Sequence, residues 1–143
     1  MNPSTSRRAV ATSLALAAAG VAVPASAASV QYKAVFQVSD ADPAKWNMTL
    51  NNMRNAQADL GAENLLIELV AYGPGIGILK ADAEVAGRVG EAAQAGIKVL
   101  ACENTMRGMK LTRAQLNPQA GSVPSGVGHL IRRQSEGYAY IRA

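Results

Sequence analysis

The only cysteine of the chain stands in a position suited to thiol chemistry. Cys102 ends an apolar segment, and the polar run Glu103–Gly108 follows it directly. If a helix begins in that run, the free N–H groups of Asn104–Arg107 point back toward the sulfur. A helix amino terminus and a nearby cation both lower the pKa of a thiol. The backbone of this run and the side chain of Arg107 are therefore the candidate groups for stabilising a thiolate.

A cysteine in this position also has a purely structural interpretation. Free cysteine is among the most buried residue types and packs as a small hydrophobe. The only histidine, His129, is expected on the surface of the last helix rather than within hydrogen-bond reach of Cys102. With one cysteine and one histidine, we expect no structural zinc site. The sequence also has no serine nucleophile motif and no paired-carboxylate motif.

Three apolar segments are predicted to form the strands that position the thiol. Their β-branched, aromatic or continuous apolar composition is typical of strands. They are Tyr32–Val38, Leu65–Ala71 and Ile97–Cys102. Ligands of open parallel sheets bind beyond the carboxyl ends of the strands. Tyr72 and Gly73, which follow the second strand, and the turn Ser39–Asp42 are therefore expected close to Cys102.

A helix is predicted on each side of the second strand. Asp42 suits the N-cap, Pro43 suits the first helical position, and Gly61 suits the end of the first helix. Between them, one apolar stripe recurs at helical spacing: Trp46, Leu50, Met53 and Leu60. The second helix is expected over Ala83–Ala95, with Asp82 as its cap.

The glycine-rich loop Tyr72–Gly77 raises the question of a nucleotide site. Its three glycines are spaced two apart, which does not match the dinucleotide-binding fingerprint, and that fingerprint follows a first strand. We therefore expect a tight turn here and no bound cofactor.

The last third of the chain predicts shorter elements. They are a short helix over Thr112–Leu116 with a capping box, a brief strand at Val123, a helix from Ser125 to Glu136 and a strand over Tyr138–Ile141. The apolar face of the last helix is expected to comprise Val127, Leu130, Ile131 and Gln134. Alternation of strands and helices predicts an α/β fold: three layers, with a mainly parallel twisted sheet of about five strands and helices on both faces.

The amino-terminal segment is predicted to be a cleavable signal peptide, residues 1–27, leaving a single domain over 28–143. Met1–Arg8 is basic, Ala9–Val23 is apolar, and Pro24–Ala28 offers small residues for cleavage after Ala27. The apolar run is shorter than the ~20 residues of a membrane-spanning helix, so we expect no membrane anchor after processing. Arg7 and Arg8 leave the Sec and twin-arginine routes both open. Either route predicts a periplasmic protein.

Charge and cysteine usage narrow the possible functions further. Loss of Arg7 and Arg8 would lower the formal net charge of +4 to about +2. No arginine-rich stripe with interleaved aromatic residues appears, so nucleic-acid binding is not expected. An exported protein with one cysteine has no internal disulfide partner, which makes its thiol a candidate for a reactive or an intermolecular role.

Several segments resemble the DsrE/DsrF-like family, which includes the sulfur-relay proteins of dissimilatory sulfur oxidation and of tRNA thiolation. The similar segments are Ala71–Ile76, Val99–Arg107, Val123–Val127 and Gln134–Ile141. The similarity is greatest to an exported branch of the family. It implies the DsrE/F-like fold and symmetric oligomers, often trimers or paired trimers. In the relay members, a cysteine at the matching strand end accepts sulfane sulfur as a persulfide, and a short run ending in Arg-Gly follows it. Cys102 and Arg107-Gly108 occupy those places here.

Two hypotheses for the function follow. The first is a periplasmic sulfur-carrier or persulfide-binding protein, in which the Cys102 thiolate attacks sulfane sulfur from a small sulfur compound or a donor protein. Its candidate substrate-binding residues are Tyr72, Gly73, Asn104, Thr105 and Arg107. The alternative is a non-catalytic oligomeric module that binds a small ligand and in which Cys102 only packs. The relay members work in the cytoplasm with partner subunits, so an exported carrier requires a different donor and acceptor.

Overall fold

Five parallel strands form one twisted sheet in the computed structural model, which describes residues 29–143. The predicted signal peptide lies outside the described residues. The strands are β1 (Tyr32–Val38), β2 (Leu65–Ala71), β3 (Lys98–Cys102), β4 (Gly121–Val123) and β5 (Ala139–Arg142). Their order across the sheet is β4-β3-β2-β1-β5, and all four pairings are parallel. The α/β fold class is therefore confirmed.

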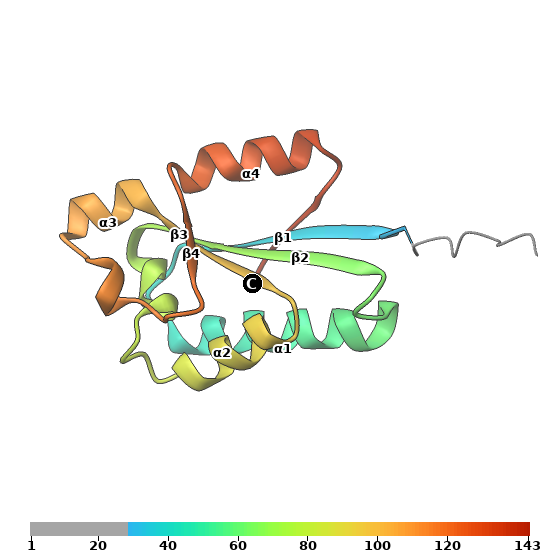
Figure 1. Ribbon diagram of the computed structural model, residues 1–143, viewed down its shortest axis with the longest axis horizontal. Helices are drawn as coiled ribbons and strands as arrows, with labels where there is room; N and C mark the ends of the chain where they lie inside the picture. The colour runs from blue at the N-terminus through green and yellow to red at the C-terminus, as the bar shows by residue number, and fades with distance from the viewer. Residues whose placement is uncertain (1–28) are drawn as a thin grey trace, which may run out of the picture.

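Helices cover both faces of the sheet, as predicted. Figure 1 shows α1 (Pro43–Leu60) and α2 (Ala86–Gln94) on one face and α4 (Gly126–Ser135) alone on the other. Helix α3 (Glu103–Met109) lies beyond the carboxyl ends of the strands. Because β4 and β5 are the two edge strands, the connection through α4 crosses the whole sheet. No helix among residues 29–143 is long and apolar enough to span a membrane.

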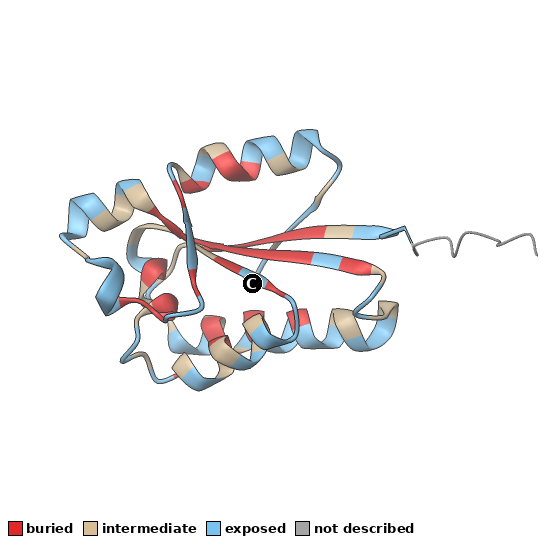
Figure 2. Cartoon of the chain, in the orientation of Figure 1, coloured by how far each residue is buried: buried red, intermediate tan, exposed pale blue. Residues whose placement is uncertain are grey.

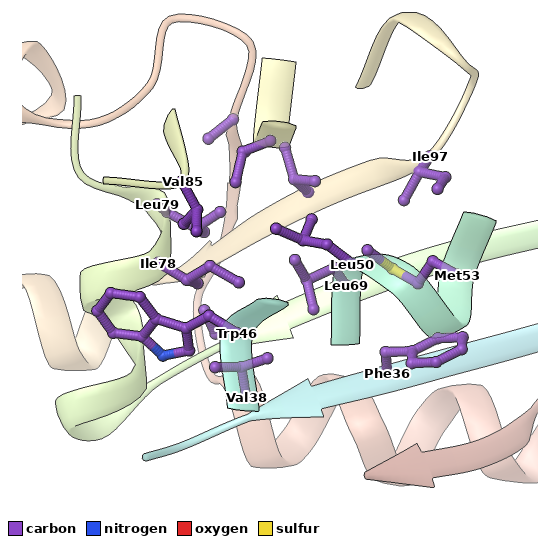
Figure 3. Close-up of a cluster of buried hydrophobic side chains, with 14 of the residues drawn as sticks. Phe36, Val38, Trp46, Leu50, Met53, Leu69, Ile78, Leu79, Val85 and Ile97 are labelled. Atoms are coloured by element: carbon purple, nitrogen blue, oxygen red, sulfur yellow. The ribbon is translucent and has the colours of Figure 1, made fainter. Parts of the chain in front are cut away.

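The main hydrophobic core lies between the sheet and the helices α1 and α2. Figure 2 shows the buried residues concentrated along the strands and on the inward sides of these helices. Phe36 of β1, Leu69 of β2 and Met53 of α1 are almost completely buried there, and Figure 3 shows them in the same cluster. The predicted stripe of α1 is confirmed, since Trp46, Leu50 and Met53 are buried and Leu60 packs against the core. Asp42 caps this helix as predicted, accepting the Ala44 N–H at 2.9 Å.

The segment between β2 and α2 differs from its prediction. Instead of a tight turn, residues Gly73–Leu79 form the 3-10 helix η1, which buries Ile76, Ile78 and Leu79. Helix α2 begins at Ala86, three residues later than predicted. Its N-cap is Val85, so the prediction of Asp82 as the cap was wrong. Both differences have one cause, because the apolar side chains of this segment are drawn into the core and set the backbone path up to Val85.

Helix α4 is rotated relative to the predicted face. Val127 and Ile131, which the sequence placed on the buried side, are 50% and 60% exposed. The buried residues of the helix are Gly126, His129 and Leu130. The prediction of a surface His129 was therefore wrong. The reason is a buried carboxylate on the sheet, Glu68, to which the helix turns its polar side chains.

Two smaller predictions in the last third are confirmed. The capping box between Thr112 and Gln115 is present at the start of the 3-10 helix η2 (Arg113–Gln115). Ser125 caps α4, and its hydroxyl accepts the Gly128 N–H at 3.1 Å.

Candidate functional site

Cys102 lies where β3 ends and α3 begins. It is the last residue of the strand and also the N-cap of the helix, and it is 5% exposed. Its neighbour across the sheet is Val123, the last residue of β4. The short link from Val123 through Ser125 places the first turn of α4 directly beside the thiol. The amino termini of α3 and α4 therefore both lie beside the sulfur atom of Cys102.

Backbone amides from these two helices surround the sulfur. The Gly126 N–H of α4 donates to Cys102 Sγ at 3.2 Å. Burial by itself raises the pKa of the thiol, because a charge is poorly solvated there. Hydrogen bonds from the Thr105 N–H, the Gly126 N–H, the Thr105 hydroxyl and the Asn104 N–H outweigh burial and lower the pKa of Cys102 below its usual value. These hydrogen bonds therefore lower the pKa of the thiol, and none of the groups that donate them is a cation.

Thr105 connects the thiol to the loop that follows β2. Its Oγ1 accepts the Gly73 N–H at 2.9 Å, while its hydroxyl and amide stabilise the sulfur. Gly73 has a positive φ of 52°, a conformation that glycine adopts without steric cost. The structure thus brings together three of the residues predicted for the site, Gly73, Thr105 and Cys102.

Tyr72 packs over the start of α4. A Cβ atom at Gly126 would lie 3.1 Å from Tyr72 Cβ and 3.3 Å from Cys102 Cβ. The Tyr72 hydroxyl accepts from Gln37 Nε2 at 2.6 Å, and the Tyr140 hydroxyl donates to Gln37 Oε1. Gln37 of β1 therefore links Tyr72, which follows β2, with Tyr140 of β5 in one hydrogen-bond network.

The contacts of Arg107 are made with its own helix. Its side chain is exposed and donates to Asn104 Oδ1 on the same helix. Backbone amides and the Thr105 hydroxyl, rather than this cation, are the groups that lower the pKa of Cys102. The Glu103 carboxylate accepts from Ser122 Oγ at 2.8 Å, so it is turned toward β4.

Sequence reasoning missed two residues of this region, Glu68 and Gly126. Glu68 is a carboxylate in the middle of the apolar strand β2, and it is 2% exposed. Burial favours its neutral form, but hydrogen bonds from Arg133 and His129 outweigh burial and lower the pKa of Glu68. The sequence contained a signal for each residue. Glu68 is a charge inside an apolar strand, and Gly126 is a glycine directly after the helix cap Ser125. Within residues 29–143, no group of three or more His, Cys, Asp or Glu side chains is placed to hold a metal ion.

The fold and this site define an α/β protein with a parallel sheet. Its single cysteine ends the third strand and accepts hydrogen bonds from backbone N–H groups. The chain belongs to the DsrE/DsrF-like family, which it matches over residues 2–143. That membership suggests a role related to sulfur relay.

Solved structures agree with this assignment. A protein of unknown function from Methanobacterium thermoautotrophicum is 39% identical, with a TM-score of 0.75 over 78% of this chain and 99% of that one. A conserved protein of unknown function from Bacteroides thetaiotaomicron shares the fold at 16% identity, with a TM-score of 0.63 over 76% of this chain and 92% of that one. No curated protein matched the sequence.

Proposed function

We propose that this protein is an exported sulfur carrier in which Cys102 accepts sulfane sulfur and holds it as a persulfide. One observation carries the proposal: the sulfur lies at the convergence of two helix amino termini, with the Gly126 N–H donating to it at 3.2 Å. Such donors stabilise an anionic sulfur. Membership of the DsrE/DsrF-like family supports sulfur as the cargo.

The proposed reaction is a single sulfur transfer. The Cys102 thiol gives its proton to solvent, and the thiolate attacks the terminal sulfur of a polysulfide. A Cys–S–S bond forms as the bond to the rest of the polysulfide breaks, and the shortened polysulfide leaves with the electron pair. With thiosulfate the same attack releases sulfite. Neither reaction needs an external oxidant, because the transferred sulfur is already at the sulfane level.

The surroundings of the thiol suggest a role for each neighbouring group. The amides of Asn104 and Thr105 and the Thr105 hydroxyl would stabilise the negative charge on the thiolate and on the persulfide. Tyr72 and Gly73 form the side of the site toward β2. Exposed Arg107 would attract an anionic sulfur donor, and beside α3 it lines a shallow depression of about 410 Å³ together with Lys110.

Burial of the thiol restricts which donors can react. At 5% exposure, Cys102 is accessible to a terminal sulfur atom rather than to a bulky reagent. We therefore propose a small sulfur anion, or the persulfide of a donor protein, as the substrate. The signal-like segment ahead of the described residues supports action in the periplasm, and fractionation of cells producing the full chain tests that location.

We propose further that the protein assembles with copies of itself. Among residues 29–143, α4 is the one helix on its face of the sheet. The exposed apolar side chains include Leu66, Val127, Ile131 and Tyr140. Light scattering of the purified protein should show a trimer or a hexamer. Ile131→Lys should shift it toward the monomer, whereas a monomeric wild-type protein would contradict the proposal.

The alternative function, a ligand-binding module with a structural cysteine, is favoured by one observation. Cys102 packs in a nearly closed site between two helices, as an inert cysteine also would. This alternative predicts that Cys102→Ser leaves assembly and ligand binding intact. It also predicts that thiol reagents label the wild-type protein only after unfolding.

Intact mass spectrometry distinguishes the two functions. Folded wild-type protein and Cys102→Ser are incubated with polysulfide or thiosulfate and measured before and after treatment with reductant. The carrier function predicts a gain of one sulfur atom on the wild type alone, removed by reductant. A wild type that gains no sulfur, or a Cys102→Ser variant that gains as much, contradicts it.

A further inference from the structure

A buried carboxylate, Glu68, lies under α4. Its partners on that helix are His129 and Arg133, about one and two turns after Gly126, the residue that contacts the thiol. Glu68 Oε2 is 2.6 Å from His129 Nε2 and 2.8 Å from Arg133 Nε. Lys98, directly beside Glu68 on β3, places its Nζ 3.9 Å from the other carboxylate oxygen. A buried carboxylate is costly unless it is paired and hydrogen-bonded. The contacts from α4 therefore let Glu68 be charged while it is buried.

Helix α4 has few other attachments to the sheet. Its buried residues are Gly126, His129 and Leu130, so Leu130 is its one buried large apolar side chain. Leu130 packs with Val35 and Val70 in a small cluster separate from the main core. Tyr72, Leu100 and Tyr138 pack around this cluster, and the ionic contacts of Glu68 are the specific polar contacts that hold the helix to the sheet.

The position of α4 matters at its amino terminus. Gly126, the first residue of the helix, donates its N–H to Cys102 Sγ at 3.2 Å and packs closely against Tyr72. Hydrogen bonds weaken steeply as distance and angle deteriorate. A shift of the helix by a fraction of an ångström would loosen this contact before it unfolded the domain.

We propose that Glu68 is a positioning residue for Cys102: through His129 and Arg133 it seats α4 so that the Gly126 N–H remains on the sulfur. The role of this arrangement in sulfur transfer rests on the proposed carrier function. The positioning of Cys102 by Glu68 is tested through the pKa of the thiol, which is measured without any sulfur transfer.

Two physical effects of Glu68 on the thiol have opposite signs. As a negative charge acting through space, Glu68 disfavours a second negative charge on the sulfur, so its removal would lower the pKa of Cys102. As a positioning residue, it maintains a hydrogen bond to the thiolate, so its removal would raise that pKa. The direction of the change therefore separates positioning from direct electrostatics.

The experiment measures the pKa of Cys102 from the pH dependence of the ultraviolet absorbance of its thiolate, with Cys102→Ser as the blank. Glu68→Gln should raise this pKa by about one unit, the size expected for loss of one hydrogen bond to a charged group. Glu136→Gln is the matched control, because Glu136 pairs with Arg133 at the exposed side of the same helix. It should leave the pKa of the thiol unchanged.

A second pair of variants keeps the test decisive if Glu68→Gln does not fold. His129→Leu removes one partner of Glu68 and should also raise the pKa of the thiol. His129→Gln retains a side-chain N–H donor and should restore most of the wild-type value. Unchanged or lowered pKa values in folded Glu68→Gln or His129→Leu would overturn the proposal. A raised pKa in a protein whose wild type takes up no sulfur would leave the positioning role standing and reject only the carrier function.

Discussion

Replacing Thr105 by valine tests the electrostatic design of the site most directly. Valine has nearly the same shape as threonine but no hydroxyl. The change removes the acceptor of the Gly73 N–H, which is 2.9 Å from Thr105 Oγ1, and removes one of the donors that lower the pKa of Cys102. The Thr105 amide, also a donor to the sulfur, is retained. Thr105→Ser keeps the hydroxyl and serves as the matched control.

The size of the effect follows from the lost hydrogen bonds. A hydrogen bond to a charged group contributes about 1.5–3 kcal/mol, and one pKa unit corresponds to about 1.4 kcal/mol. Because three amides remain on the sulfur, we take the lower end and expect the pKa of the thiol to rise by about one unit. The unpaired Gly73 N–H should lower the free energy of unfolding by about 1 kcal/mol.

Two measurements check these values. The pH dependence of the thiolate's ultraviolet absorbance gives the pKa of the thiol, and urea unfolding gives the free energy of unfolding. Thr105→Val should shift both, and Thr105→Ser should shift neither by more than a small fraction of that change. If Thr105→Val lost stability but kept the wild-type pKa, the hydroxyl would have only a structural role, and its contribution to the acidity of the thiol would be refuted.

Three further changes test other parts of the structure. Gly126→Ala would place a Cβ 3.1 Å from Tyr72 Cβ; the thiolate absorbance should report a raised thiol pKa, and urea unfolding a loss of about 1 kcal/mol. Gly75→Ala would place a Cβ 2.4 Å from the carbonyl oxygen of Val38; it should lower the free energy of unfolding by about 3 kcal/mol, and wild-type stability would show that η1 can move. Because the folded pKa of Glu68 lies below its usual 4.5, its stabilisation is present above that pH and is lost as pH falls through the folded value. The wild type should therefore lose more stability than Glu68→Gln as the pH falls below 4.5, and equal losses in urea unfolding would contradict the ion pairing.

Local patterns were sufficient for much of the fold. The bounds of β1 and β2 agree with the predicted segments, since mainly apolar runs of seven residues between turns have the length of a strand and are too short for a typical helix. The stripe from Trp46 to Leu60 fixed the buried side of α1 for the same reason. The position of Cys102 at the end of β3, just before a helical turn, also followed from neighbouring residues alone.

The orientation of α4 did not follow from its own sequence. Its apolar residues predicted a face containing Val127 and Ile131, yet those side chains are exposed. The preference of Glu68 for ionic partners overrides the apolar periodicity, because an unpaired buried carboxylate costs more than two exposed aliphatic side chains. Since Glu68 and His129 are 61 residues apart, no local pattern contained this contact.

The sequence by itself determined the α/β order, the strands and a single thiol at the ligand-binding edge of the sheet. Only the tertiary structure decided what surrounds that thiol. Gly73, Thr105 and Gly126 come from three separate segments, and they meet at Cys102 only after the sheet has formed and α4 has crossed it. Hydrogen bonds depend on distances of a few tenths of an ångström, and the periodicity of a sequence specifies faces and ends rather than such distances.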